Sequence, residues 1–268
     1  MNKKRKKKKN VKNNSMFEGR INEKNFLGAV IDKESKQIRV YSNDMLFKRI
    51  HRDSKKIAKS FDKLCNEELI EISELFSESV YMAGDGLIRA ACDESEIKIT
   101  SSKLLMNALI TIQASVELLR KGYILQPGML LRSTIETVST VAYFLLDDDG
   151  YGKYISGKLD VNKTIKYGKQ VIPPIGRIQG FLSNNFVHIG NLHSENNTVT
   201  EYDEMIEPLR INLGLIKAAT WLVYVVIELA FYDYFDEHKF WSKIAENGYK
   251  FEITTEKKIW MNDFFKIE

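Results

Sequence analysis

The sequence predicts an all-α fold, a helical bundle with a long central helix, and three observations support this prediction. Apolar residues recur at three- and four-residue spacing through most of residues 44–236, the spacing of an amphipathic helix. The chain has 268 residues, of which 44% are hydrophobic, and only four prolines, so it is long enough to bury a large core without disulfides or metals. Residues 218–227 are apolar nearly all round, which is typical of a central helix.

The expected elements follow from this periodicity in chain order. Ser101 and Ser102 are candidate N-caps of a helix that ends at Arg120, and Pro127 suits the first turn of the next helix. A short loop joins these two helices, so we expect them to lie antiparallel. Residues 37–41 alternate as a short strand does, and residues 147–152 and 190–200 are expected to be loops. The predicted helices cover residues 44–64, 67–92, 101–120, 127–147, 161–170, 173–188, 203–235 and 255–265.

The formal net charge of +4 conceals an asymmetry between the two parts of the chain. Eight lysines and arginines lie in the first twelve residues, so the remaining chain carries −4. Residues 1–15 contain almost nothing apolar and cannot offset the entropy of ordering, which predicts a disordered basic arm. Residues 16–268 are predicted to form a single helical domain, with the bundle core at about residues 44–236.

The pattern of cysteines and apolar runs favours a cytoplasmic protein with no membrane-spanning segment. Cys65 and Cys92 belong to no framework of spaced pairs, so we expect reduced thiols. A polar stretch at residues 10–24 follows the basic start where a secretory signal would be apolar. Residues 218–227 are bracketed by Lys217 and Glu228 and are shorter than a membrane span.

The helix after Pro127 carries the first candidate constellation. Arg132, Glu136, Ser139 and Tyr143 follow one another at helical spacing, so they form one polar band beside the apolar face. An Arg and a Glu placed in this way can form a half-buried ion pair with a purely structural role. The alternative is that the band lines a polar cleft.

A second stripe lies on the expected central helix and includes Lys217, Tyr224 and Glu228. A charge within a run suited to burial is costly unless it is paired, so both charges need partners. Pairing inside the bundle is one interpretation. The other is a cleft between this stripe and the Arg132 band that binds a small molecule or nucleotide.

The third feature is the segment at residues 183–193. Asn184 and His188 are four residues apart and would share a face if the helix continues, and His193 follows in a polar loop. The pKa of a histidine suits proton transfer, although a lone histidine also serves as a core or capping residue. The sequence contains neither the ligand spacings of a metal site nor a glycine-rich phosphate loop, so we expect no metal and no cofactor.

The Arg132-Ser-x-x-Glu136 segment, followed some fifty residues later by Ser183-x4-His188, resembles uncharacterised bacterial helical proteins of the HEPN-like kind. Many members of that class belong to toxin-antitoxin, abortive-infection or other phage-defence systems. Their nucleases act without metal through an Arg, a polar residue and a His four to six positions on. The resemblance covers residues 101–232 and implies a bundle that dimerises through the His-bearing helix. One departure is that Ser183 stands where the motif has Arg.

Three functions remain open on this basis. The resemblance implies a metal-independent endoribonuclease with His188 as general acid or base, where Arg132 or Arg177 would supply positive charge. Its partners would be RNA, a second copy of the chain, and a cognate antitoxin or defence protein. The alternatives are a nonenzymatic interaction module with a structural Arg132, Glu136 and His188 network, and a small-molecule or nucleotide binder. The candidate binding residues are Arg177, Asn184, His193, Lys217 and Tyr224.

Overall fold

The computed structural model describes residues 25–32, 36–194, 199–245 and 248–265, and its contacts divide the chain into two units at Asp53. The first unit comprises residues 1–53 and the second residues 54–268. The single domain expected at residues 16–268 spans this division. The expected disordered arm, residues 1–15, lies outside the described residues.

The first unit contains a two-stranded antiparallel hairpin, β1 (Phe26–Asp32) and β2 (Gln37–Ser42). β2 confirms the alternating strand expected at residues 37–41. A short helix, α1 (Met45–Lys48), and a π-helical turn, η2 (Arg49–Asp53), follow. The helix expected at residues 44–64 is therefore irregular in its first half. Its second half is α2 (Ser54–Leu64), which belongs to the second unit.

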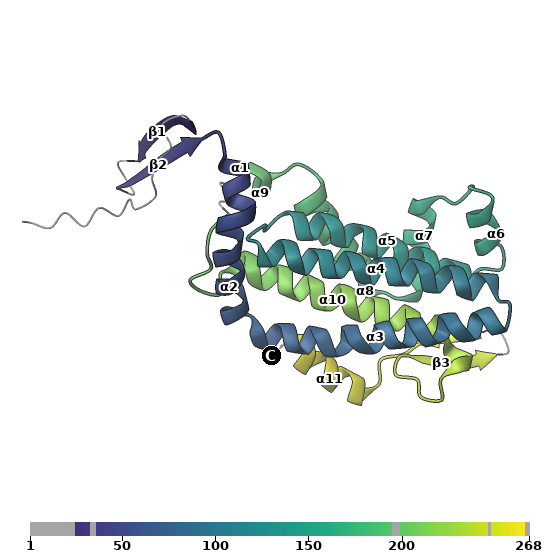
Figure 1. The fold of residues 1–268 in the computed structure, drawn as a ribbon. Helices are drawn as coiled ribbons and strands as arrows, with labels where there is room; N and C mark the ends of the chain where they lie inside the picture. Colours follow the sequence, from purple (N-terminus) through teal and green to yellow (C-terminus); the bar gives the residue numbers. More distant parts are fainter. Residues whose placement is uncertain (1–24, 33–35, 195–198, 246–247, 266–268) are drawn as a thin grey trace, which may run out of the picture. The chain divides into compact units, whose positions relative to one another are not determined.

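The second unit is a helical bundle, which confirms the predicted fold class (Figure 1). Its four long helices lie side by side, and the central one contacts each of the other three. They are α3 (Asn66–Cys92), α4 (Glu96–Arg120), α5 (Gln126–Leu146) and α10 (Glu207–Ala230). α2 packs against α3 and α4.

α10 is the central helix that the apolar run predicts. Every residue from Ala219 to Ala230 is buried. The helix is shorter than the expected residues 203–235, because it begins at Glu207, where Pro208 fits the first turn, and gives way to a 3-10 turn, η4 (Tyr232–Tyr234). α5 and α10 are long and apolar enough to cross a membrane, but 89% of the most apolar window of α10 is buried among its neighbours, as in a core helix.

The expected start of α4 is wrong. The helix begins at Glu96, and both Ser101 and Ser102 are buried within it. Ser102 Oγ donates a hydrogen bond to the carbonyl of Ala83 on α3, 2.8 Å away. The hydroxyl of Ser102 therefore links two helices. In the sequence such a serine looks like an N-cap, because in both cases a small polar residue lies beside an apolar run.

Short elements connect α5 to α10. The helices expected at residues 161–170 and 173–188 are confirmed as α7 (Val161–Val171) and as α8 (Pro174–Leu182) with its π-helical continuation η3 (Ser183–Val187). Two further short helices, α6 (Gly150–Ile155) and α9 (Asn191–Ser194), lie where loops were expected. Each is a turn or two long, too short to carry a recognisable period.

The C-terminal segment adds a second hairpin, β3 (Trp241–Ala245) and β4 (Gly248–Phe251), which the sequence analysis missed. The buried Phe240 and the half-buried Phe251 face Trp221 of α10 with ring centroids 5.7 and 6.3 Å away. The last helix, α11 (Thr255–Phe265), confirms the segment expected at residues 255–265 and contacts α10. Aromatic packing thus attaches the hairpin to the bundle core.

Candidate functional site

The candidate site lies where α5 meets the end of α8, and Arg132 is its central residue. Arg132 Nη1 forms an ion pair with Glu136 Oε1 at 2.5 Å, one turn along the same helix. Arg132 Nε donates a hydrogen bond to Ser183 Oγ at 3.0 Å. The Arg132 side chain is 17% exposed and that of Glu136 38%, so the pair lies at the border between core and solvent. The ion pair expected between Arg132 and Glu136 is therefore present, and the hydrogen bond to Ser183 links Arg132 to the end of α8.

Gln179 is a member of this cluster that the sequence analysis missed. Its amide nitrogen donates to Ser183 Oγ at 3.2 Å, so the serine oxygen receives hydrogen bonds from two side chains. The signal in the sequence was the four-residue spacing of Gln179 and Ser183 on a predicted helix. Without the structure nothing indicated that the two residues meet the Arg132 side chain.

A glycine allows this close approach of the two elements. A Cβ atom on Gly128, four residues before Arg132, would lie 2.3 Å from the Phe186 ring. Phe186 belongs to η3 and is buried, so its ring occupies the space that a side chain on α5 would need. The absence of a side chain at Gly128 therefore lets η3 pack closely against α5, and this packing positions the segment that leads to His188.

His188 follows a π-helical turn. Its backbone N–H donates to the Ser183 carbonyl at 2.9 Å, five residues back, and its own backbone is extended, with φ −80° and ψ 135°. The helix therefore ends here, and the i, i+4 relation expected between Asn184 and His188 is replaced by the pairing of Ser183 with His188. The His188 side chain is exposed, and within the described residues it makes no hydrogen bond to Arg132 or Glu136.

The two other candidates in this segment have different surroundings. Asn184 is exposed. His193 is half-buried, accepts a hydrogen bond from the Gly190 N–H at Nδ1 (3.3 Å) and places Nε2 3.2 Å from the Phe186 carbonyl oxygen. A carbonyl oxygen only accepts, so in this pairing Nε2 is the donor. Both ring nitrogens of His193 thus bind backbone groups and hold the loop that follows η3.

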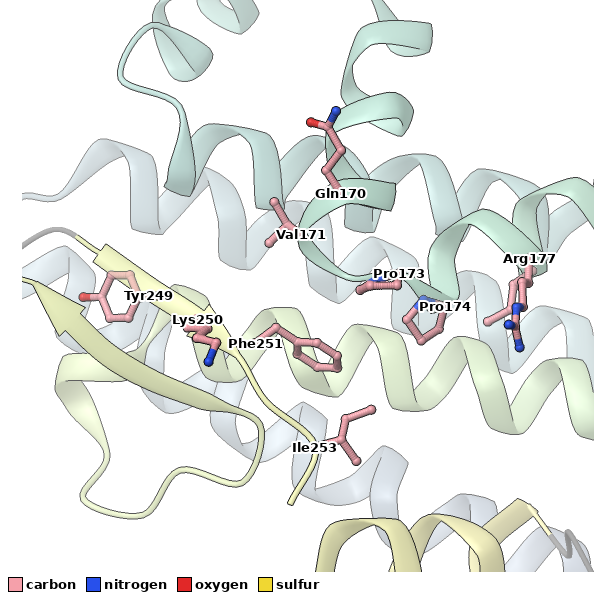
Figure 2. Close-up of a pocket in the computed structure, with 10 residues that line it drawn as sticks. Gln170, Val171, Pro173, Pro174, Arg177, Tyr249, Lys250, Phe251 and Ile253 are labelled. Carbon is pink, nitrogen blue, oxygen red and sulfur yellow. The ribbon is translucent and has the colours of Figure 1, made fainter. Parts of the chain in front are cut away.

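Arg177 does not join the Arg132 cluster. It is two residues from Gln179 on α8, which places the two side chains about 200° apart around the helix. Arg177 is exposed and lines an open pocket with the C-terminal hairpin (Figure 2). Of the two arginines named as possible sources of positive charge, Arg132 is the one whose side chain contacts Ser183.

Lys217 and Tyr224 face α3 and the C-terminal segment. Lys217, 4% exposed, forms an ion pair with Glu71 and donates to the Phe264 carbonyl at 2.9 Å. Tyr224 donates to Glu78 Oε1 at 3.0 Å, and burial, followed by the nearby Glu78 and Glu228, raises the pKa of its hydroxyl. These contacts confirm that the charge of Lys217 is paired inside the bundle. The alternative interpretation, a cleft between this stripe and the Arg132 band, does not match these contacts, because the stripe faces α3 and the C-terminal segment whereas Arg132 faces Ser183.

Tyr224 also lines an open pocket of about 530 Å³ between α3, α11 and the segment that follows η4. Its lining includes carboxylates and aromatic rings, and Lys239 pairs with Glu78 at 2.7 Å on its wall. Across the described ranges, no three His, Cys, Asp or Glu side chains are grouped as a metal site would require. The best candidates for a functional site are therefore Arg132, Glu136, Ser183 and the exposed His188.

Comparison with known proteins adds nothing to this geometry. No family model, no curated protein and no solved structure matches the chain.

Proposed function

We propose that this chain is a HEPN-like helical protein of a defence or toxin-type system and acts as a metal-independent endoribonuclease. The observation that carries this proposal is the 3.0 Å hydrogen bond from Arg132 to Ser183. Ser183 holds the first position of the segment that ends in His188, where the motif has Arg. A guanidinium from α5 therefore lies beside the position at which the sequence lacks one.

The chemistry would divide between two residues. His188 is exposed and free to meet a substrate, so as a base it would take the proton of the ribose 2′-hydroxyl, whose oxygen attacks the phosphorus. The bond from phosphorus to the 5′-oxygen breaks, the protonated His188 returns the proton to that oxygen, and a 2′,3′-cyclic phosphate remains. Arg132 would stabilise the charge that develops on the phosphate oxygens. The π-helical turn that carries the segment supports this assignment, because single π turns occur often at functional sites.

The ion pair between Arg132 and Glu136 sets a condition on this reaction. Glu136 neutralises much of the charge that a phosphate would need, so a second cation must enter the site. A second protomer, bound through the segment that carries His188, would supply it, and a cognate antitoxin would act by covering the same surface. The Lys-rich arm at residues 1–12 would add nonspecific attraction to RNA.

An RNA cleavage assay in EDTA tests the proposal, because EDTA silences contaminating metal-dependent nucleases. We expect the purified protein to cut RNA and His188→Ala to lose about a hundredfold or more of that rate. His51→Ala is the matched control, since His51 is an exposed histidine of the first unit, and it should cut as the parent does. Absence of cleavage by the parent, or equal cleavage by the His188 variant, would contradict the proposal.

A specific observation also favours a second function, a nonenzymatic interaction module. Arg132, Glu136, Ser183 and Gln179 already form a closed set of contacts that joins α5 to α8, as a structural network would. In that case Arg132→Ala should lower the melting temperature by several degrees, because Ser183 and Glu136 lose their partner. His188→Ala should melt as the parent does. A stable Arg132→Ala variant would contradict this alternative.

A further inference from the structure

An open pocket of about 820 Å³ lies between the turn that joins α7 to α8 and the C-terminal hairpin (Figure 2). Its volume is in the range of small-molecule sites. Most of its wall is apolar: Val171, Pro173, Pro174, Ile178, Phe251 and Ile253. Figure 2 shows Arg177 at one end of this wall and Tyr249 at the other, with the prolines and Phe251 between them.

The wall is anchored to the bundle core. The Phe251 ring lies 5.6 Å from the Trp241 ring and 6.3 Å from Trp221 on α10, measured between centroids. Tyr249 packs edge-on against Tyr232 at 4.9 Å. A wall held by such contacts keeps its shape when a ligand arrives, which lowers the entropy cost of binding.

Arg177 is the cation of this pocket whose charge is not balanced by a neighbouring carboxylate. Within the described parts of the chain, its guanidinium forms no ion pair and no hydrogen bond. Lys250, the other cation of the pocket, is already compensated, because it pairs with Glu252 Oε1 at 2.5 Å and thereby lowers the pKa of that carboxyl. The pocket therefore presents one uncompensated positive charge beside an apolar wall.

We propose that this pocket binds an organic carboxylate with an apolar body, whose carboxylate pairs with Arg177. A guanidinium presents two parallel N–H groups that match the two oxygens of a carboxylate. The chain of the ligand would lie along the prolines, Phe251 and Ile253 and remove their apolar surface from water. This site is separate from the Arg132 cluster, and it stands whether or not the protein cuts RNA.

Calorimetric titration of the full chain with octanoate tests the proposal. We expect octanoate to bind, while octylamine, with the same chain and the opposite charge, and acetate, with the same charge and no chain, do not. Arg177→Gln should weaken octanoate binding about tenfold or more. Arg210→Gln is the matched control: Arg210 is exposed on α10 and does not line the pocket, so its loss should leave binding unchanged.

A second variant tests the apolar wall. Ile253→Asp places a negative charge on the half-buried wall and should abolish octanoate binding, with circular dichroism confirming that the helices remain. Three results would overturn the proposal: no octanoate binding by the parent, equal binding by Arg177→Gln, or octylamine binding as tightly as octanoate. The last result would reduce the pocket to an apolar patch without selectivity for an anion.

Discussion

Two charged residues of α10, Lys217 and Glu228, are buried, and the chain stabilises them differently. Lys217 meets a carboxylate, Glu71, as expected for a buried charge. Glu228 is 1% exposed and accepts hydrogen bonds at Oε1 from the backbone N–H groups of Phe240 at 2.7 Å and Trp241 at 3.0 Å. Its Oε2 atom is buried with no hydrogen-bond partner in the described part of the chain. This carboxyl therefore holds the backbone at the start of β3, whereas Lys217 forms an ion pair.

The first prediction concerns the titration of Glu228. Burial raises the pKa of its carboxyl, against the opposing effect of the backbone N–H groups. The folded state then holds a proton that the unfolded state has released above about pH 4.3, so this residue makes the protein less stable as pH rises through the raised pKa. Glu228→Gln keeps the accepting oxygen and removes the charge. We expect the variant to melt above the parent at pH 8.

Thermal melting between pH 5 and 8 measures this effect, and the gap between the two proteins should narrow toward pH 5. Glu228→Ala is the companion variant. It leaves the N–H groups of Phe240 and Trp241 without an acceptor, at a cost of about 1–3 kcal/mol for each unsatisfied group, so it should melt below the parent at every pH. A Gln variant that is less stable than the parent at pH 8 would contradict the raised pKa.

At the scale of elements, the contact between α5 and η3 determines the geometry of the candidate site. Gly128 and Phe186 provide the close approach, and Arg132, Ser183 and Gln179 provide the polar contacts. The two sets lie one helical turn apart on α5. A change at Gly128 should therefore move η3 without removing any polar side chain.

The second prediction is that Gly128→Ala destabilises the protein through η3. The added Cβ would lie 2.3 Å from the Phe186 ring, which must shift. Overpacking of this kind costs about 1–3 kcal/mol, or a melting temperature lower by a few degrees for each kcal/mol. Gly180→Ala is the control, because a Cβ there meets nothing within 4 Å. Equal melting of the two variants would show that η3 does not pack on α5 as described.

At the scale of the whole molecule, the buried core belongs to the second unit. Among the described residues, the core cluster begins at Ile57 and ends at Phe264, and those of the first unit contribute none of its members. β1 and β2 form an isolated pair with exposed apolar residues such as Leu27 and Ile31. A two-stranded hairpin alone is at best marginally stable in water.

The third prediction follows from this division of the core. Residues 54–268 expressed alone should fold with a helical circular dichroism spectrum and a cooperative melt close to that of the full chain, because the whole core cluster is retained. Residues 1–53 alone should show no cooperative melt. Loss of the transition in the larger fragment would show that the first unit is needed for the fold of the second.

The sequence by itself determined the class of fold, the long helices α3, α5 and α10, and the shorter helices α7 and α11. A helix of several turns repeats its apolar period often enough to be recognised locally. It also determined that Arg132 and Glu136 lie on one face and that Lys217 needs a partner within the bundle, because these are consequences of helical spacing and of the cost of a buried charge.

Only the tertiary structure decided which elements meet. The contact of Arg132 with Ser183 joins residues 51 positions apart, and that of Lys217 with Glu71 joins residues 146 apart, distances over which no local pattern acts. The π-helical turn before His188 and the hairpin of β3 and β4 depend on Phe186 against Gly128 and on aromatic packing against α10. The separation of Arg177 from Arg132 was decided in the same way, by the rotation of α8 as it packs.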